Sequence, residues 1–136
     1  MKTFTAPFAQ TPKTNTAVLT AASAITNDIP TNTVLLVTAG TDGSLLTSLS
    51  FLPRATVTAT GLYLFLSKDN GVTQRLIDSE LMAAYTMSAT TAVPETKFAN
   101  IAENSPIRLE AGDKLYVSMG VALAGGVVAK AEWTDF

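Results

Sequence analysis

The chain has 136 residues, no histidine and no cysteine, and it carries a net charge of −2 with an isoelectric point near 4.9. This composition excludes disulfide scaffolds, thiol chemistry and zinc sites with His or Cys ligands. The lack of any basic cluster argues against nucleic acid as a partner. Charged residues make up only 15% of the chain, against about 25% in typical proteins. We therefore expect either a surface covered by a partner or a large core of small side chains.

Residues 1–14 are predicted to form an extended N-terminal arm, because Pro7 and Pro12 interrupt any regular period. Phe4 and Phe8 are the large apolar side chains of this arm. They pack either against the chain's own core or against a neighbouring subunit, and the sequence does not choose between the two.

The remaining residues, 15–136, are predicted to form a single β-domain. The stretch Val18–Ile25 is compatible with either a strand or a helix. Strands are predicted at Thr33–Ala39 and Leu45–Leu52, and the glycine-rich turn between them predicts a hairpin. Thr56–Leu66 has the strongest β-pattern, with β-branched and aromatic residues throughout.

The next part of the chain alternates turns with short elements. Lys68–Gly71 contains Asn-Gly and predicts a tight turn, followed by a returning strand over Val72–Ile77. Ser79–Tyr85 is compatible with a short helix that begins at a serine cap. The polar run Ala89–Ser105 is predicted to be a long connection.

The C-terminal part returns to strands. Ile107–Leu109 and Lys114–Met119 are predicted strands joined by a tight turn at Glu110–Asp113. Ala124–Gly126 predicts a hairpin turn before the last strand, Val127–Trp133. This succession of short strands predicts an all-β fold, an antiparallel β-sandwich or jelly roll. The residues expected in its core are Leu36, Leu64, Leu66, Leu115 and Val117.

The sequence offers little for catalysis or metal binding. A nucleophilic serine normally needs a neighbouring base, most often histidine. The carboxylate pairs Asp78 with Glu80 and Glu110 with Asp113 fit structural roles better than glycoside hydrolysis. Asp69 opens a fragment of a calcium loop that lacks the later acidic ligand. We therefore expect no enzyme activity, no catalytic residue, no metal and no cofactor.

Function is expected to lie in contact surfaces. The large apolar side chains near the two ends of the chain are the candidate interface residues: Phe4, Phe8, Trp133 and Phe136. Trp133 also fits a role as a core residue, because it lies on a predicted strand. Carbohydrate binding would need exposed aromatic platforms, and aromatic residues make up only 7% of the chain.

Three segments carry a resemblance to a known class of protein: LVTAGTDGSLL at 36–46, ATVTATGLYLFLS at 55–67 and LEAGDKLYV at 109–117. With the aromatic-rich end AEWTDF, they resemble small structural proteins (capsid decoration or head proteins) of tailed bacteriophages and phage-like gene transfer particles. The similarity covers roughly residues 30–136, and its motifs are strand-and-turn patterns rather than reactive sites.

The resemblance implies a capsid decoration (cement) protein on the outer surface of the virion head. Its implied partners are the major capsid protein and further copies of itself, commonly as a trimer, and it would be made in the cytoplasm of a bacterial host. No secretory signal is visible, and the longest near-apolar run is far shorter than the roughly 20 residues that span a bilayer, so no membrane partner is expected. The alternatives are another virion part, such as a tail, connector or fibre-base protein, and a carbohydrate-binding β-sandwich module.

Overall fold

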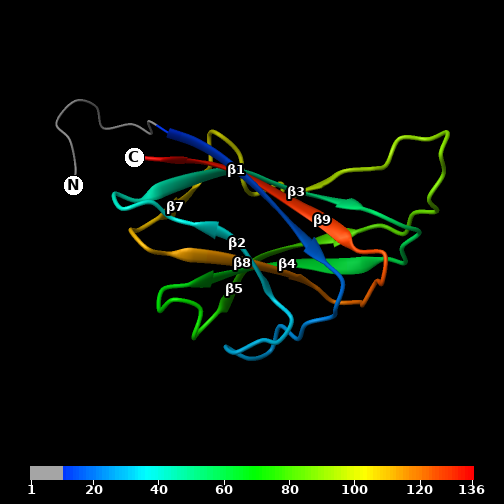
Figure 1. The fold of residues 1–136 in the computed structure, drawn as a ribbon, viewed down its shortest axis with the longest axis horizontal. Helices are drawn as coiled ribbons and strands as arrows, with labels where there is room; N and C mark the ends of the chain where they lie inside the picture. The colour runs from blue at the N-terminus through cyan, green and yellow to red at the C-terminus, as the bar shows by residue number, and fades with distance from the viewer. Residues whose placement is uncertain (1–10) are drawn as a thin grey trace.

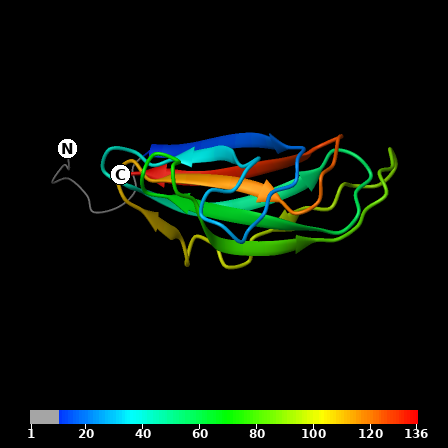
Figure 2. The same ribbon diagram turned by 90° about the horizontal axis from the view of Figure 1, so that it is seen from below.

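The structure is a computed structural model that describes residues 11–136. Within this range the chain forms nine β-strands and no helix, and the strands lie in two layers that pack face to face (Figures 1 and 2). All strand pairs in both sheets are antiparallel, so the predicted all-β antiparallel sandwich is confirmed. The strands are β1 (Thr11–Leu19), β2 (Val34–Thr38), β3 (Ser44–Pro53), β4 (Thr60–Ser67), β5 (Arg75–Met82), β6 (Thr96–Lys97), β7 (Ile107–Leu109), β8 (Lys114–Met119) and β9 (Val127–Asp135).

Consecutive strands mostly belong to different sheets. Sheet A has the order β1-β9-β3-β6, with β7 also paired to β3, and sheet B has the order β2-β8-β4-β5. Among the described strands, only β4 and β5 are both consecutive in sequence and hydrogen-bonded to each other. Their turn contains Asn70 and Gly71, both with positive φ, which confirms the tight turn predicted at Lys68–Gly71.

Two predicted hairpins are wrong. The turn at Gly40–Gly43 joins β2 of sheet B to β3 of sheet A, and the turn at Ala124–Gly126 joins β8 to β9 in the same way. Both turns form at the predicted positions, and Gly43 and Gly126 have positive φ. Each of these turns carries the chain from one sheet to the other. The two strands that it joins pair with strands distant in the sequence instead of with each other.

Several boundaries also differ from the prediction. The strand predicted to return from Val72 begins at Arg75, and β6 lies within the connection predicted at Ala89–Ser105. Strand β1 begins at Thr11 and pairs with β9, so residues 11–14 belong to sheet A rather than to an arm. The predicted helix at Ser79–Tyr85 is wrong, because its first four residues complete strand β5 against β4. Strand β4 begins at Thr60, so residues 56–59 lie outside the long strand that the sequence predicted.

The core lies between the two sheets and is built from side chains that point inward from both. Leu36, Leu64, Leu115 and Val117 are buried as predicted, whereas Leu66 is half-buried and packs against the core from its edge. Phe51 and Phe98 stack within it at a ring separation of 5.4 Å. Each fully buried large apolar side chain stabilises the fold by about 1.5–3 kcal/mol.

Candidate functional site

The connections at one end of the sandwich carry almost no charge. They are residues 20–24, 54–59, 83–94 and 120–126, which lie on the right in Figure 1. Arg54 is the only charged residue in these four segments, and Glu95, the last residue of the β5–β6 connection, borders them and pairs with Lys97 at 3.8 Å. We call this surface the neutral end, and it draws on connections from both sheets.

Backbone hydrogen bonds join the four segments into one surface. Leu123 N donates to Thr20 O at 3.0 Å, and Arg54 N donates to Gly126 O at 2.9 Å. Gly125 also approaches Ala55 closely, since a Cβ added at Gly125 would lie 2.4 Å from the Cβ of Ala55. The segments therefore support one another and present a connected surface.

The longest segment of the neutral end, residues 83–94, projects from the sandwich in Figure 1. Its base is fixed, because Tyr85 and Val57 exchange two backbone hydrogen bonds of 2.9 Å. Met87 N donates to Thr56 Oγ1 at 3.0 Å, and the Tyr85 hydroxyl lies 2.9 Å from Thr91 Oγ1. These contacts hold an uncharged loop that is rich in alanine and threonine in a defined position.

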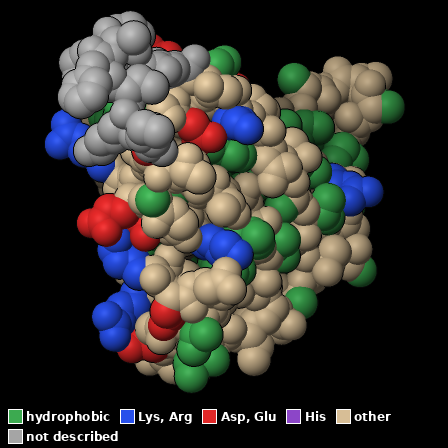
Figure 3. Space-filling view, turned by 60° about the vertical axis from the view of Figure 1, so that its left-hand side comes forward, with side chains coloured by type: hydrophobic (Ala, Val, Ile, Leu, Met, Phe, Trp, Pro, Cys, Tyr) green, Lys and Arg blue, Asp and Glu red, His purple; other side chains and the backbone are tan. Residues whose placement is uncertain are grey.

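The opposite end of the sandwich is rich in paired charges, and acidic and basic side chains lie close together on it in Figure 3. Lys68 Nζ lies 2.9 Å from Asp113 Oδ2 and 3.4 Å from Glu110 Oε2. The hydrogen bond to Asp113 is the main cause that raises the pKa of Lys68 above its ordinary value. At the C-terminal strand, Ser44 Oγ donates to Asp135 Oδ1 at 2.5 Å.

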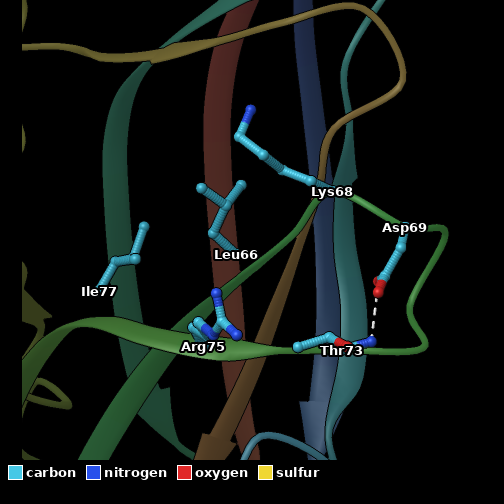
Figure 4. A pocket seen from close by; sticks show the side chains of 6 residues that line it. All are labelled: Leu66, Lys68, Asp69, Thr73, Arg75 and Ile77. Atoms are coloured by element: carbon cyan, nitrogen blue, oxygen red, sulfur yellow. Dashed lines mark hydrogen bonds between the residues drawn. The ribbon is translucent and has the colours of Figure 1, made fainter.

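A groove at this charged end is lined by residues of β4, of β5 and of the turn that joins them, and Figure 4 shows these residues. Leu66 and Ile77 form its apolar wall, and the other lining residues are Lys68, Asp69, Thr73 and Arg75. Arg75 pairs with Asp28 at 3.4 Å, and Asp69 accepts a 2.8 Å bond from Thr73 N. This bond is the main cause that lowers the pKa of Asp69. The charged groups of the groove thus already have partners within the chain, which favours a structural role.

The two candidate carboxylate pairs have intrachain partners. Asp78 Oδ1 accepts from Asn100 Nδ2 at 3.2 Å, and Glu80 Oε2 accepts from Ala99 N at 3.4 Å. Asp113 is buried and accepts from Glu110 N at 2.9 Å within the predicted turn. Across residues 11–136 no three acidic, histidine or cysteine side chains come together as a metal site would require. The same range contains no helix of the length and apolar character needed to cross a membrane.

Of the four predicted interface residues, Trp133 and Phe136 lie in the described part of the chain. Phe136 is 38% exposed at the charged end. Trp133 is only 8% exposed and belongs to the core between the sheets, which confirms its alternative role as a core residue. Phe4 and Phe8 lie outside the described residues.

Sequence reasoning missed the neutral end. The sign of this surface in the sequence is that residues 83–94 and 120–126 contain no charged side chain. Such a signal points to a surface only when the fold brings the segments together. Comparison of the chain with protein families, with curated proteins and with solved structures gives no match.

Proposed function

We propose that this chain is a structural protein of a virus particle, a capsid decoration protein that binds the outside of a phage head through its neutral end. The observation that supports this is a connected surface, built from four segments, in which Arg54 is the only charge and Glu95 lies at the border. A surface of this kind suits contact with another protein, because it can be covered without leaving charges buried and unpaired.

We also propose that the sandwich is a jelly roll, and the strand order supports this. Leaving aside the two-residue β6, sheet A reads β1-β9-β3-β7 and sheet B reads β2-β8-β4-β5. Eight strands interleaved in this way form two Greek keys. Jelly rolls occur in viral capsid domains, in lectins and in cupins, so the fold fits a virion role without identifying it.

We also propose that the chain is not an enzyme. Its candidate carboxylates hold the backbone and side chains of neighbouring turns, and the sequence supplies no histidine or cysteine. A cement protein needs rigid β-structure and a surface for contact, and the two-sheet sandwich with its neutral end suits both needs. The sequence resemblance to decoration proteins points in the same direction.

The test is binding to heads of the particle whose genome encodes this chain, purified without it. Full-length protein is expected to pellet with assembled heads but not to bind unassembled capsid subunits. Labelled protein should appear on head faces in electron micrographs, and labelling of tails would replace the proposal with a tail role. Binding should change little with ionic strength, because salt screens charges and the neutral end has only Arg54 and, at its border, Glu95.

Two matched variants locate the contact. Ala89 lies at the neutral end and Ala111 at the charged end, and both are exposed alanines in turns. Ala89→Lys should weaken head binding, because the contact would bury an unpaired charge. Ala111→Lys should bind like the unmodified chain. Equal binding by both variants would contradict docking through the neutral end.

A further inference from the structure

The β4–β5 turn contains the only Asn-Gly pair of the chain, Asn70-Gly71. In such a pair the backbone nitrogen of the glycine can attack the side-chain amide carbon of the asparagine, because glycine has no Cβ to obstruct the approach. A new C–N bond closes a five-membered succinimide, and the side-chain NH2 leaves as ammonia with the glycine N–H proton. Water then opens the ring on either side and gives aspartate or iso-aspartate. The reaction needs only water as a co-reactant.

The amide of Asn70 is open to this reaction. Asn70 is exposed, with a φ of 62°, and Gly71 follows with a φ of 89°. Within residues 11–136 no hydrogen bond fixes the Asn70 side chain. By contrast, four other asparagines hold a neighbouring backbone or side-chain group through their side chains: Asn15, Asn27, Asn32 and Asn100. Asn70 therefore serves the turn through its backbone conformation and leaves its side-chain amide free to react.

The attacking nitrogen, in contrast, is held by the fold. Gly71 N donates a 2.7 Å hydrogen bond to Ser67 Oγ, and Ser67 is fully buried. The same hydroxyl donates to Asp69 Oδ1 at 3.0 Å. That carboxylate oxygen also accepts the bond from Thr73 N that Figure 4 shows. Gly71 N has to leave Ser67 before it can reach the side chain of Asn70, so the reaction proceeds from a locally opened turn.

Packing against Tyr116 restrains the turn further. A Cβ added at Gly71 would overlap the Tyr116 hydroxyl, so the backbone of the turn lies directly against this side chain. Ring closure moves the peptide between Asn70 and Gly71. In the iso-aspartyl product the main chain runs through the former side chain, which adds a methylene group to the backbone at this crowded position. The closed turn thus favours the unmodified asparagine.

We infer that Asn70 is the first asparagine of this chain to deamidate, and that Ser67 sets the rate by holding Gly71 N. The product places a new carboxylate beside Asp69 in a chain whose net charge is already −2. The site lies at the charged end of the sandwich, away from the neutral end. The inference is therefore independent of the proposed function.

The test follows one tryptic peptide of the full-length chain by mass spectrometry. Trypsin cleaves after Lys68 and Arg75, so the peptide of residues 69–75 contains Asn70 and no other asparagine. After prolonged incubation of the folded chain at mildly alkaline pH, this peptide should split into aspartyl and iso-aspartyl forms before any other asparagine reacts. In the chain unfolded by urea the same peptide should convert about tenfold faster or more, because the turn is then always open.

Two serines of sheet B give a matched pair of variants. Ser67 and Ser118 are both fully buried, but Ser118 Oγ has no hydrogen-bond partner among the described residues. Ser67→Ala should speed the conversion about 2- to 10-fold, which is the change in local opening expected from the loss of one hydrogen bond. Ser118→Ala should leave the rate unchanged. Asn70→Gly keeps a residue that accepts positive φ and should abolish the conversion.

Hydrogen exchange of the unmodified chain guards against a Ser67→Ala variant that does not fold. The Gly71 amide should exchange slowly, and urea concentrations below the unfolding transition should speed its exchange and the deamidation of Asn70 in proportion. The inference is overturned if another asparagine reacts first, or if folded and unfolded chains convert at the same rate. Equal rates in folded Ser67→Ala and Ser118→Ala would show that Ser67 does not control the reaction.

Discussion

The ammonium group of Lys68 lies 2.9 Å from a carboxylate oxygen of Asp113 and so joins the β4–β5 turn to the β7–β8 turn. The same oxygen accepts a 2.9 Å hydrogen bond from Glu110 N, and Asp113 is only 4% exposed. One buried carboxylate therefore closes its own turn and holds the neighbouring one. This dual contact explains why an aspartate follows Gly112 in the segment that carries the sequence resemblance.

Removing this carboxylate should weaken the fold. Asp113→Ala is expected to lower the free energy of unfolding by about 1–3 kcal/mol, because Glu110 N loses its acceptor in a buried setting. Asp113→Asn keeps an oxygen that can accept that bond and should cost less. Lys68→Ala should also cost less, since its side chain is 55% exposed. Urea unfolding followed by circular dichroism measures all three, and equal losses would contradict the dual role.

The pH dependence of stability should report on Asp69. Hydrogen bonds from Thr73 lower the pKa of Asp69 below its ordinary value of 3.8. A carboxyl group with a lowered pKa stabilises the fold above its unfolded pKa and loses that contribution as pH falls through the folded pKa. The difference in unfolding free energy between the unmodified chain and Asp69→Asn should therefore be constant near neutrality and shrink below about pH 4. A difference that persisted into strong acid would contradict the ionic role of Asp69.

Tyr63 lies close to both Gly61 and Gly120 but approaches them differently, so replacing each glycine by alanine should have a different effect when Tyr63 is also changed. A Cβ added at Gly120 would lie 2.7 Å from the Tyr63 hydroxyl but 3.4 Å from the next ring atom. At Gly61 the same Cβ would lie 2.6 Å from the hydroxyl and 2.8 Å from the ring. Each alanine should therefore destabilise the fold, by about 1–3 kcal/mol for overpacking.

The second substitution Tyr63→Phe separates the two sites. It removes the hydroxyl and should restore most of the stability lost in Gly120→Ala. It should not rescue Gly61→Ala, because the ring carbon remains in the way. Thermal unfolding of the single and double variants measures the coupling, and rescue of both glycines would show that the ring is free to move.

Much of the fold could be predicted from local patterns. Turn signals beside short apolar runs identified β8 and β9. Asn70-Gly71 identified the β4–β5 hairpin, because that turn lies between strands that pair with each other. The same reasoning failed at Gly43 and Gly126, where equally clear turns link different sheets. A turn motif predicts where the chain reverses direction. It does not predict which strands pair, because pairing depends on contacts between residues that are distant in the sequence.

The candidate surfaces were harder to predict for the same reason. Ser79–Met82 has the helix-compatible composition of a capped segment, yet pairing with β4 makes it a strand and sends Leu81 outward. Trp133 lies on the inner side of β9, and its register, not its residue type, decides that it is buried.

The start of β1 predicts how truncation should act. Thr11 to Thr14 pair with β9, and Lys13 lies opposite Trp133. A chain lacking residues 1–14 should therefore unfold at lower urea than one lacking residues 1–10, because it loses four paired residues at the sheet edge. Trp133 is the only tryptophan, so its emission should shift to longer wavelength in the shorter chain as water reaches its ring. Identical unfolding curves and emission spectra for the two truncations would contradict the pairing of residues 11–14 with β9.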